Sequence, residues 1–196
     1  MIGIISLGIS NITSLKNAID VLNFKSFLIE EPNQILYAEK ILLPGVGNFK
    51  EAMKRLRKSG LDKALKKAAS NGIPIMGICL GMQLLADKGY EGSEDSEGSE
   101  TKGLGLIPGE VRQITGNNIK LPHMGWNTLH IKKNNKILSS DFNNIDYYFI
   151  HSFEFVVKNN ENLLATVEYG KQVTAVVGNN NIFGCQFHPE KSQRAG

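Results

Sequence analysis

The sequence predicts an α/β protein with a doubly wound, mostly parallel sheet and added β-hairpins. Three observations support this fold class. In the first half, apolar runs of strand length alternate with amphipathic helical runs, which favours parallel pairing with helices on both sheet faces. In the second half, short β-rich segments are separated by turns rich in Asn and Gly, which suit hairpins. A length of 196 residues suits one domain, so we predict a single domain over residues 1–196.

The first half begins with a buried strand and then alternates helices with strands. Its longest helical segment has basic residues between apolar ones at helical spacing, and Ser59-Gly60 interrupts it. We interpret the basic side as a solvated helix face and not a nucleic-acid site, because no aromatic residues interleave with the charges. Strands are expected over 2–7, 26–29, 40–43 and 73–78, and helices over 13–22, 49–71 and 80–87.

The second half adds strands that we expect to close the same domain. Before them, residues 90–102 form an acidic, Gly- and Ser-rich segment, which we interpret as a solvated loop and not a metal site. Breaks such as Asn159-Asn160 mark the turns between strands. Strands are expected over 111–114, 127–131, 147–150, 153–157, 163–168, 174–177 and 182–187.

The composition is that of a globular protein, with 41% hydrophobic and 21% charged residues. The longest apolar runs are too short to cross a bilayer, and Met1 leads directly into a buried-strand run where a secretion signal would stand. Two cysteines without an export signal indicate a reducing cytoplasm. We therefore predict a cytoplasmic protein with no membrane or nucleic-acid partner, no metal and no cofactor.

Cys79 stands between a strand-type run and a helix-forming run. Gly77 and Gly81 flank it two residues away on either side, so the pattern G-x-C-x-G has the form of a nucleophile elbow. Glycines suit such an elbow because its backbone is cramped and strained. A thiol at a helix N-terminus is favoured as thiolate by the helix dipole and the unpaired N–H groups. The pattern therefore predicts a cysteine nucleophile.

Downstream, His188 and Glu190 offer an imidazole and a carboxylate two residues apart. A thiol, a base and an acid that orients the base are the parts of a hydrolytic triad. Ligands of open α/β sheets bind at the carboxyl ends of strands, where Gly47 and Cys79 both fall, so we expect these sites to converge. Cys185 lacks the glycine frame and is expected to be a buried, inert residue.

Six segments of the chain match the motifs of one known family. They are LPGVG at 43–47, GICLGMQLL at 77–85, GLGLIPG at 103–109, PHMGWN at 122–127, FIHSF at 149–153 and QFHPEKS at 186–192. The chain resembles the class I (triad-type) glutamine amidotransferases, which implies their flavodoxin-like sheet. The segment at 122–127 is more specific and is similar to the branch of glutaminase subunits of imidazole glycerol phosphate synthase, from histidine biosynthesis.

The resemblance implies hydrolysis of L-glutamine to glutamate and ammonia through a thioester. Cys79 would attack the side-chain amide, His188 would transfer the proton, and Glu190 would orient the imidazole. The remaining roles that it implies are an oxyanion hole formed by Leu80 with Gly47 or its neighbour Val46, and a substrate site formed by Gln83, Glu91, His151, Ser152 and Phe153.

The resemblance also implies a partner, a (β/α)8-barrel synthase subunit that forms a heterodimer with the chain and receives its ammonia. That partner makes imidazole glycerol phosphate and AICAR. We therefore expect glutaminase activity to depend on the partner. The positions that match the docking face of the family are Asn11, Met124, Trp126, Tyr148 and Lys191.

The chain departs from the family pattern near its N-terminus, where the usual Asp-Tyr-Gly and Gly-Asn-Leu are replaced by Ser6-Leu7-Gly8 and Ser10-Asn11-Ile12. These differences affect the expected interface and leave the chemistry unchanged. Two alternatives stay open: a paralogue that supplies ammonia to an enzyme modifying surface-polysaccharide sugars, and a stand-alone cysteine γ-glutamyl hydrolase. A binding or regulatory subunit without turnover is disfavoured because the triad is intact.

Overall fold

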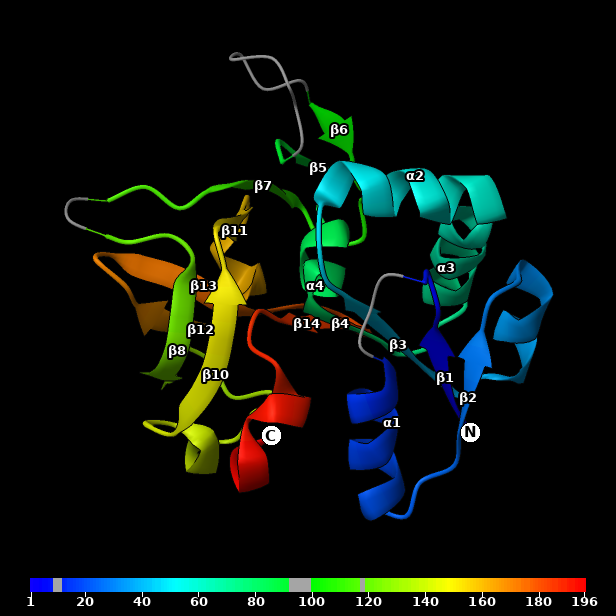
Figure 1. Cartoon of the computed structure of the whole chain (residues 1–196), viewed down its shortest axis with the longest axis horizontal. Helices are drawn as coiled ribbons and strands as arrows, with labels where there is room; N and C mark the ends of the chain where they lie inside the picture. The colour runs from blue at the N-terminus through cyan, green and yellow to red at the C-terminus, as the bar shows by residue number, and fades with distance from the viewer. Residues whose placement is uncertain (9–11, 92–99, 117–118) are drawn as a thin grey trace.

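A computed structural model describes residues 1–8, 12–91, 100–116 and 119–196 (Figure 1). Its centre is an eight-stranded sheet with the order β2-β1-β3-β4-β14-β13-β12-β9. The part from β2 to β14 is parallel and has the strand order of flavodoxin-like folds, as the resemblance implied. These parallel strands are β2 (Ser26–Ile29), β1 (Ile2–Ile5), β3 (Lys40–Gly45), β4 (Ile75–Cys79) and β14 (Ile182–Cys185). The antiparallel strands are β13 (Gln172–Asn179), β12 (Leu163–Glu168) and β9 (His130–Ile131).

Helices cover both faces of the parallel part of the sheet, as predicted (Figure 1). The expected break near Gly60 is confirmed, because Gly60 adopts a left-handed φ of 77° between two helices. Asn48 caps the first of them by accepting a hydrogen bond from the Glu51 amide. The helices are α1 (Ile12–Val21), α2 (Phe49–Ser59), α3 (Leu61–Ser70) and α4 (Leu80–Leu84), with a 3-10 helix η1 (Pro32–Tyr37) that the sequence analysis missed.

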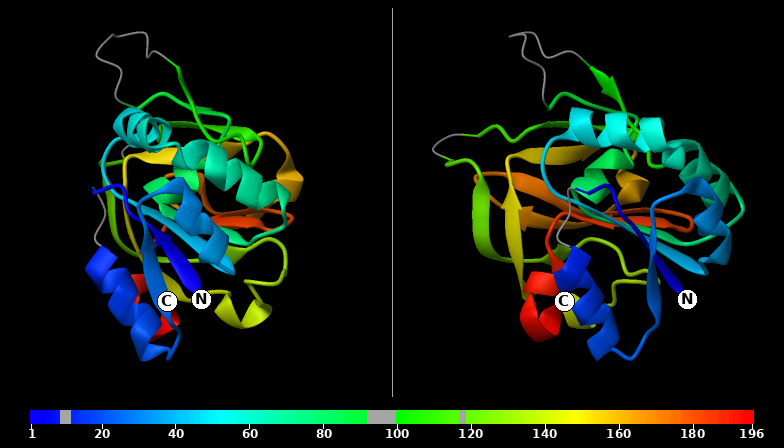
Figure 2. Two further views of the ribbon diagram at one scale, coloured as in Figure 1. Left: turned by 90° about the vertical axis from the view of Figure 1, so that its right-hand side faces the viewer. Right: turned by 45° about the vertical axis from the view of Figure 1, so that its right-hand side comes forward.

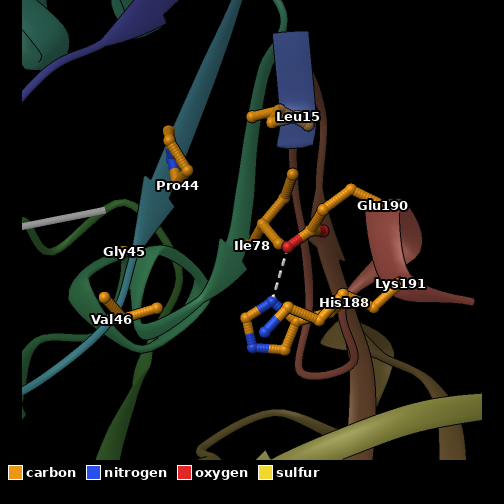
Figure 3. A pocket seen from close by; sticks show the side chains of 8 residues that line it. All are labelled: Leu15, Pro44, Gly45, Val46, Ile78, His188, Glu190 and Lys191. Atoms are coloured by element: carbon orange, nitrogen blue, oxygen red, sulfur yellow. Dashed lines mark hydrogen bonds and ion pairs between the residues drawn. The ribbon is translucent and has the colours of Figure 1, made fainter. Parts of the chain in front are cut away.

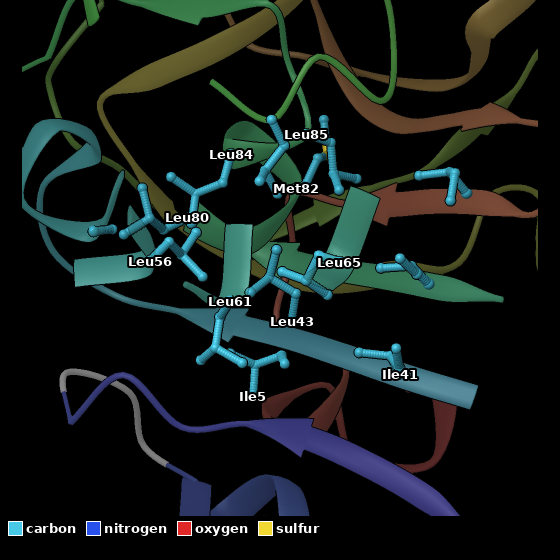
Figure 4. Close-up of a cluster of buried hydrophobic side chains, with 14 of the residues drawn as sticks. Ile5, Ile41, Leu43, Leu56, Leu61, Leu65, Leu80, Met82, Leu84 and Leu85 are labelled. Carbon is cyan, nitrogen blue, oxygen red and sulfur yellow. The ribbon is translucent and has the colours of Figure 1, made fainter. Parts of the chain in front are cut away.

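Two apolar clusters lie on opposite faces of the sheet. In one, the side chains of α2, α3 and α4 pack on β1, β3 and β4, and Leu43, Leu65 and Met82 are among its members (Figure 4). In the other, α1 packs on the opposite face together with Tyr147 and Phe149. Every large member of the first cluster named here is fully buried, so the sheet is a rigid base for its strand ends.

The second half of the chain also forms two smaller sheets beside the main one (Figure 2). The strands β8 (His123–Thr128) and β10 (Asp146–His151) pair with each other. The other sheet contains β11 (Phe153–Val157), β7 (Gly109–Gln113), β5 (Lys88–Gly89) and β6 (Thr101–Lys102). The short 3-10 helices are η2 (Ser140–Phe142), η3 (Asn160–Asn162), η4 (Pro189–Lys191) and η5 (Gln193–Ala195).

Several predicted boundaries differ by a few residues, and two predicted elements were wrong in a larger way. The helix expected over 80–87 ends at Leu84, because the carbonyls of Leu84 and Leu85 accept hydrogen bonds from Leu104 and Leu106 of a following loop. The strand expected over 127–131 is divided between β8 and β9, which belong to different sheets. The acidic segment predicted as a loop lies largely outside the described residues. Among the helices that the structure describes, none has the length and apolar character needed to span a bilayer.

Candidate active site

The nucleophile elbow predicted at Cys79 is present where β4 turns into α4. Cys79 has φ 55° and ψ −114°, a conformation that costs a non-glycine residue energy and is typical of functional turns. A methyl group at Gly77 would lie 2.5 Å from the Gly81 carbonyl oxygen, and one at Gly81 would collide with the Leu43 carbonyl. The two glycines are therefore required by close backbone approach, as the sequence pattern indicated.

Parallel pairing brings His188 and Glu190 to this elbow. β14 lies beside β4 with Cys185 opposite Ile78, so the chain after β14 arrives next to Cys79. His188 Nδ1 lies 2.8 Å from Glu190 Oε1, and both side chains are buried (Figure 3). Carboxylate pairing at Nδ1 leaves Nε2 as the reactive nitrogen.

The surroundings of His188 determine its charge. Its Nε2 is buried and has no hydrogen-bond partner among the described residues. Burial disfavours the imidazolium, but the attraction of Cys79 and Glu190 outweighs it and raises the pKa of His188 to about 9. At neutral pH the arrangement therefore favours an imidazolium next to the cysteine, which is the charge state that accompanies a thiolate.

A cavity of about 250 Å³ opens in front of Cys79. It brings together the residues that the sequence analysis assigned to the nucleophile, the base, the oxyanion hole and the substrate site, whereas Glu190 lies behind His188. Gly47 has a positive φ of 99°, which a glycine adopts without strain. The cavity is lined by Val46, Gly47, Cys79, Leu80, Gln83, Glu91, Ile150, His151, Ser152, Phe153, His188 and Lys191.

Glu91 and Gln83 line the cavity while they also hold the protein backbone. Glu91 Oε2 accepts a hydrogen bond of 2.9 Å from the amide of Phe49, at the start of α2. Burial raises the pKa of Glu91, and this hydrogen bond opposes the rise. Gln83 Nε2 lies 3.1 Å from the Phe153 carbonyl and 3.0 Å from Gln186 Oε1. The Gln83 nitrogen therefore donates both of its hydrogen bonds within the protein.

A pair of neutral histidines supports the cavity wall. His151 Nδ1 lies 2.8 Å from the Phe153 carbonyl, and His151 Nε2 lies 3.0 Å from His123 Nδ1. Burial lowers the pKa of both histidines to about 4. The His151 side chain therefore holds Phe153. Sequence reasoning gave no role to His123 or Gln186, although both lie inside the quoted motifs.

The predicted docking residues gather on the β8–β10 pair. Tyr148 pairs with Trp126 across the two strands, and their rings lie 6.1 Å apart in a T-shaped arrangement. Lys191 Nζ lies 6.0 Å from the centre of the Tyr148 ring. Met124 and Trp126 are 58% and 49% exposed, so two large apolar side chains lie at the surface of this strand pair. Asn11 lies outside the described residues.

The residues that the structure describes contain no group of three His, Cys, Asp or Glu side chains that could hold a metal ion. A strained cysteine, a carboxylate-paired imidazole and an adjacent cavity are the arrangement of an acyl-transfer hydrolase with a cysteine nucleophile.

The fold is that of the class I glutamine amidotransferases. Residues 4–196 match the family described as "Glutamine amidotransferase class-I", and the chain belongs to that family and is a glutamine-hydrolysing enzyme. Within that class the chain is 44% identical to "Imidazole glycerol phosphate synthase subunit HisH" of Oceanobacillus iheyensis, over 100% of this chain and 94% of that protein. It is 42% identical to "Imidazole glycerol phosphate synthase subunit HisH 1" of Campylobacter jejuni, over 100% of this chain and 95% of that protein.

Solved structures agree on the fold. A "glutamine amidotransferase" superposes with a TM-score of 0.73 at 18% identity, covering 96% of this chain and 90% of that one. PurLQS from Thermotoga maritima superposes with a TM-score of 0.73 at 21% identity, covering 100% of this chain and 91% of that one. The family and the fold class predicted from the sequence are therefore confirmed.

Proposed function

We propose that the protein is the glutaminase subunit of a two-protein synthase and that Cys79, His188 and Glu190 are its catalytic residues. The observation that carries this proposal is the strained Cys79 in one cavity with His188, whose imidazole is paired to Glu190. We also propose that the whole chain is one glutaminase domain. Its cytoplasmic location remains a prediction.

The first half of the reaction forms a thioester. The Cys79 sulfur attacks the side-chain amide carbon of glutamine and gives a tetrahedral oxyanion. The backbone N–H of Leu80, at the first position of α4, has no acceptor within the helix, so it is available to the oxyanion together with that of Gly47 or Val46. The imidazolium of His188 donates its proton to the leaving nitrogen, and ammonia departs.

The second half returns the enzyme to its starting state. His188, now neutral, takes a proton from water while the water oxygen attacks the thioester carbon. Collapse of this second tetrahedral state releases glutamate and the Cys79 thiolate. Glu190 holds Nδ1 throughout and stabilises the imidazolium each time it forms. The cavity of about 250 Å³ suits a substrate of amino-acid size, held by Glu91, Gln83 and residues 151–153.

We infer that the exposed face of Met124, Trp126, Tyr148 and Lys191 docks onto a (β/α)8-barrel synthase subunit. Large exposed apolar side chains gathered on one face are typical of interfaces. Two curated relatives are named as synthase subunits, which supports a heterodimer and ammonia transfer to the barrel. An acceptor on a surface-polysaccharide pathway is the alternative, and co-purification of the barrel protein decides between them.

The decisive experiment compares Cys79→Ala with Cys185→Ser in the complex with the partner. Glutamate release should fall at least about 10³-fold in Cys79→Ala, because no other group can form the thioester. Cys185 is fully buried away from the cavity lining, so Cys185→Ser should keep its activity per folded molecule. Wild-type glutamate release by Cys79→Ala would refute the assignment, and full turnover by the isolated chain would favour a stand-alone hydrolase.

A further inference from the structure

We propose that Gln186 is a hydrogen-bond donor to the sulfur of Cys79, and that Gln83 fixes the amide of Gln186 in the donating orientation. The proposal rests on Cys79 being the nucleophile of the function proposed above. Gln186 is fully buried, and its Nε2 lies 3.7 Å from Cys79 Sγ. This distance is within the range of hydrogen bonds to sulfur, which is a larger atom than oxygen.

The orientation of both amides follows from a backbone carbonyl. The carbonyl of Phe153 can only accept, so the Gln83 group 3.1 Å from it must be the NH₂. The same NH₂ lies 3.0 Å from Gln186, so Gln186 must present its oxygen there. The NH₂ of Gln186 is therefore left facing Cys79, and turning either amide over would place two donors or two acceptors against each other.

The histidine pair defines the same carbonyl from the other side. Since Phe153 O accepts, His151 carries its proton on Nδ1, and its Nε2 is an acceptor for the Nδ1–H of His123. His123 Nε2 in turn accepts from Asn127 Nδ2, which also donates to the Glu168 carbonyl. Two directed chains of hydrogen bonds thus meet at Phe153 and hold it as an acceptor.

The strand geometry explains why Gln186 reaches the sulfur. Gln186 follows β14, and its backbone N–H continues the sheet by donating to the Ala175 carbonyl over 2.8 Å. Residues two apart on an extended chain point to the same side, so Gln186 and His188 both face Cys79. Phe187 points the other way and packs against Tyr147 and Phe149.

The donor distinguishes the two charge states of Cys79. As a thiol, Cys79 donates to the Ile150 carbonyl over 3.9 Å. As a thiolate it loses that partner, because a carbonyl has no proton to give, whereas the Gln186 N–H becomes a charge-assisted donor. The amide is neutral and does not titrate, so it stabilises the thiolate without taking the proton that His188 must deliver. Gln186 therefore acts on the sulfur, and Gln83 is a positioning residue.

Two substitutions at Gln186 separate this role from a structural one. Gln186→Met keeps the size and removes both hydrogen bonds. Gln186→Glu keeps an acceptor for Gln83 and places an oxygen in front of the sulfur where the donor was. A structural role predicts an unchanged pH profile of Cys79 in the neutral Met variant, whereas a donor role predicts a rise there; the charge of Glu adds a rise in either case. The readout is the rate of Cys79 alkylation by iodoacetamide against pH, followed on the peptide that contains Cys79 in the full-length chain.

We expect the midpoint of that pH profile to rise by about one unit in Gln186→Met and by more in Gln186→Glu. At pH values below both midpoints, alkylation should be roughly tenfold slower in the Met variant. The matched control is Asn162→Leu, which removes another buried amide–carbonyl bond, from Asn162 Nδ2 to Gly178, and should lower stability while the midpoint stays unchanged. A midpoint that stays at the wild-type value in Gln186→Met would overturn the proposal.

The readout also separates this inference from the proposed function. If alkylation responds to Gln186 while Cys79→Ala still releases glutamate, the function is wrong and the donor role stands. If Cys79→Ala abolishes glutamate release while alkylation ignores Gln186, the function stands and the donor role is wrong. Should Gln186→Met fail to fold, Gln186→Leu, which is also neutral and offers no donor, gives the same readout.

Discussion

Steric packing forms one side of the active site, and hydrogen bonds form the other. On the nucleophile side, which comprises β4, α4 and Cys79, the backbone of Gly81 lies against that of β3, and little except glycine fits. On the histidine side, which comprises β8, β10 and residues 186–192, hydrogen bonds between distant segments place His123, His151 and His188. Substitutions that change side-chain volume should therefore affect the nucleophile side most. Changes of polarity or pH should affect the histidine side most.

This difference suits the two tasks of the site. The nucleophile needs a fixed backbone, because its strain and its helix N-terminus depend on the elbow geometry. The base must change its charge twice in each cycle, and hydrogen bonds can follow such a change. The histidine side is also the one that carries the exposed residues Met124 and Trp126, so a docked partner would act on the adjustable part of the site.

The largest effect is expected from Gly81→Ala on the nucleophile side. A methyl there would collide with the Leu43 carbonyl, and Gly45 of the same strand also lies close to the Gly81 backbone, so α4 would have to move away from β3. We expect a loss of about 4 kcal/mol or more in the free energy of unfolding, measured by urea denaturation. In the same variant, the elbow geometry should no longer influence the rate of Cys79 alkylation.

Gly72→Ala is the matched control for that substitution. Gly72 has a positive φ of 81° but no neighbour within 4 Å of the added carbon, so only backbone strain applies. It should cost about 1 kcal/mol. Equal losses at Gly72 and Gly81 would show that backbone conformation, and not packing, defines the nucleophile side.

The second effect is acid destabilisation of the histidine side. His123 and His151 have pKa values lowered to about 4 by burial, against about 6.5 in an unfolded chain. Between those values the unfolded chain binds more protons, so stability is fully present above pH 6.5 and is lost as the pH falls towards 4. Each histidine should remove about 2 kcal/mol between pH 7 and pH 5, measured by urea denaturation at both values.

His188 contributes with the opposite sign. Its pKa is raised to about 9, so its contribution to stability is fully present below pH 6.5 and is lost as the pH rises through 9.

His123→Gln should reduce the loss of stability between pH 7 and pH 5 by about half, whereas His130→Gln, at an exposed position, should leave that loss unchanged. A stability that does not change between pH 7 and pH 5 would contradict the neutral histidine pair.

The comparison also explains what could be predicted from the sequence. The elbow is a local pattern, so Gly77, Cys79 and Gly81 identified the nucleophile side without any knowledge of distant contacts. The convergence of Gly47 and Cys79 followed from the rule that parallel strands end at one edge, whereas His188 was expected beside Cys79 because a hydrolytic triad needs a base. The sequence does not show the bond between Gln83 and Gln186, because residues 103 positions apart meet only through the order of β4 and β14.

Short elements and motifs with distant partners also limited what could be predicted from the sequence. β5 and β6 contain two residues each, which is too few for a periodicity to be recognised. His123 was quoted as part of a motif, yet its partner His151 is 28 positions away and pairs with it across β8 and β10. The one local sequence signal for the position of Gln186 was its spacing from His188, because residues two apart on an extended chain lie on the same side.

The smallest effect is expected from Ser192→Ala, which tests how the histidine side is fastened. Ser192 is 1% exposed, and its hydroxyl accepts from the Tyr148 amide over 3.0 Å and donates to the His188 carbonyl over 2.7 Å. Removing it leaves the Tyr148 amide unpaired, which should cost about 1–2 kcal/mol of stability.

Activity should respond more than stability does. The His188 amide still donates to the Tyr148 carbonyl and the His188 carbonyl still accepts from the Lys191 amide, so the chain stays in place while His188 loses one of three backbone hydrogen bonds. We expect kcat in the complex to fall roughly tenfold with KM unchanged, because the base is misplaced and the substrate site is intact. Ser70→Ala, which removes an exposed hydroxyl on α3, should change neither quantity. An unaltered kcat in Ser192→Ala would mean that the Ser192 hydroxyl is not needed to position the His188 imidazole.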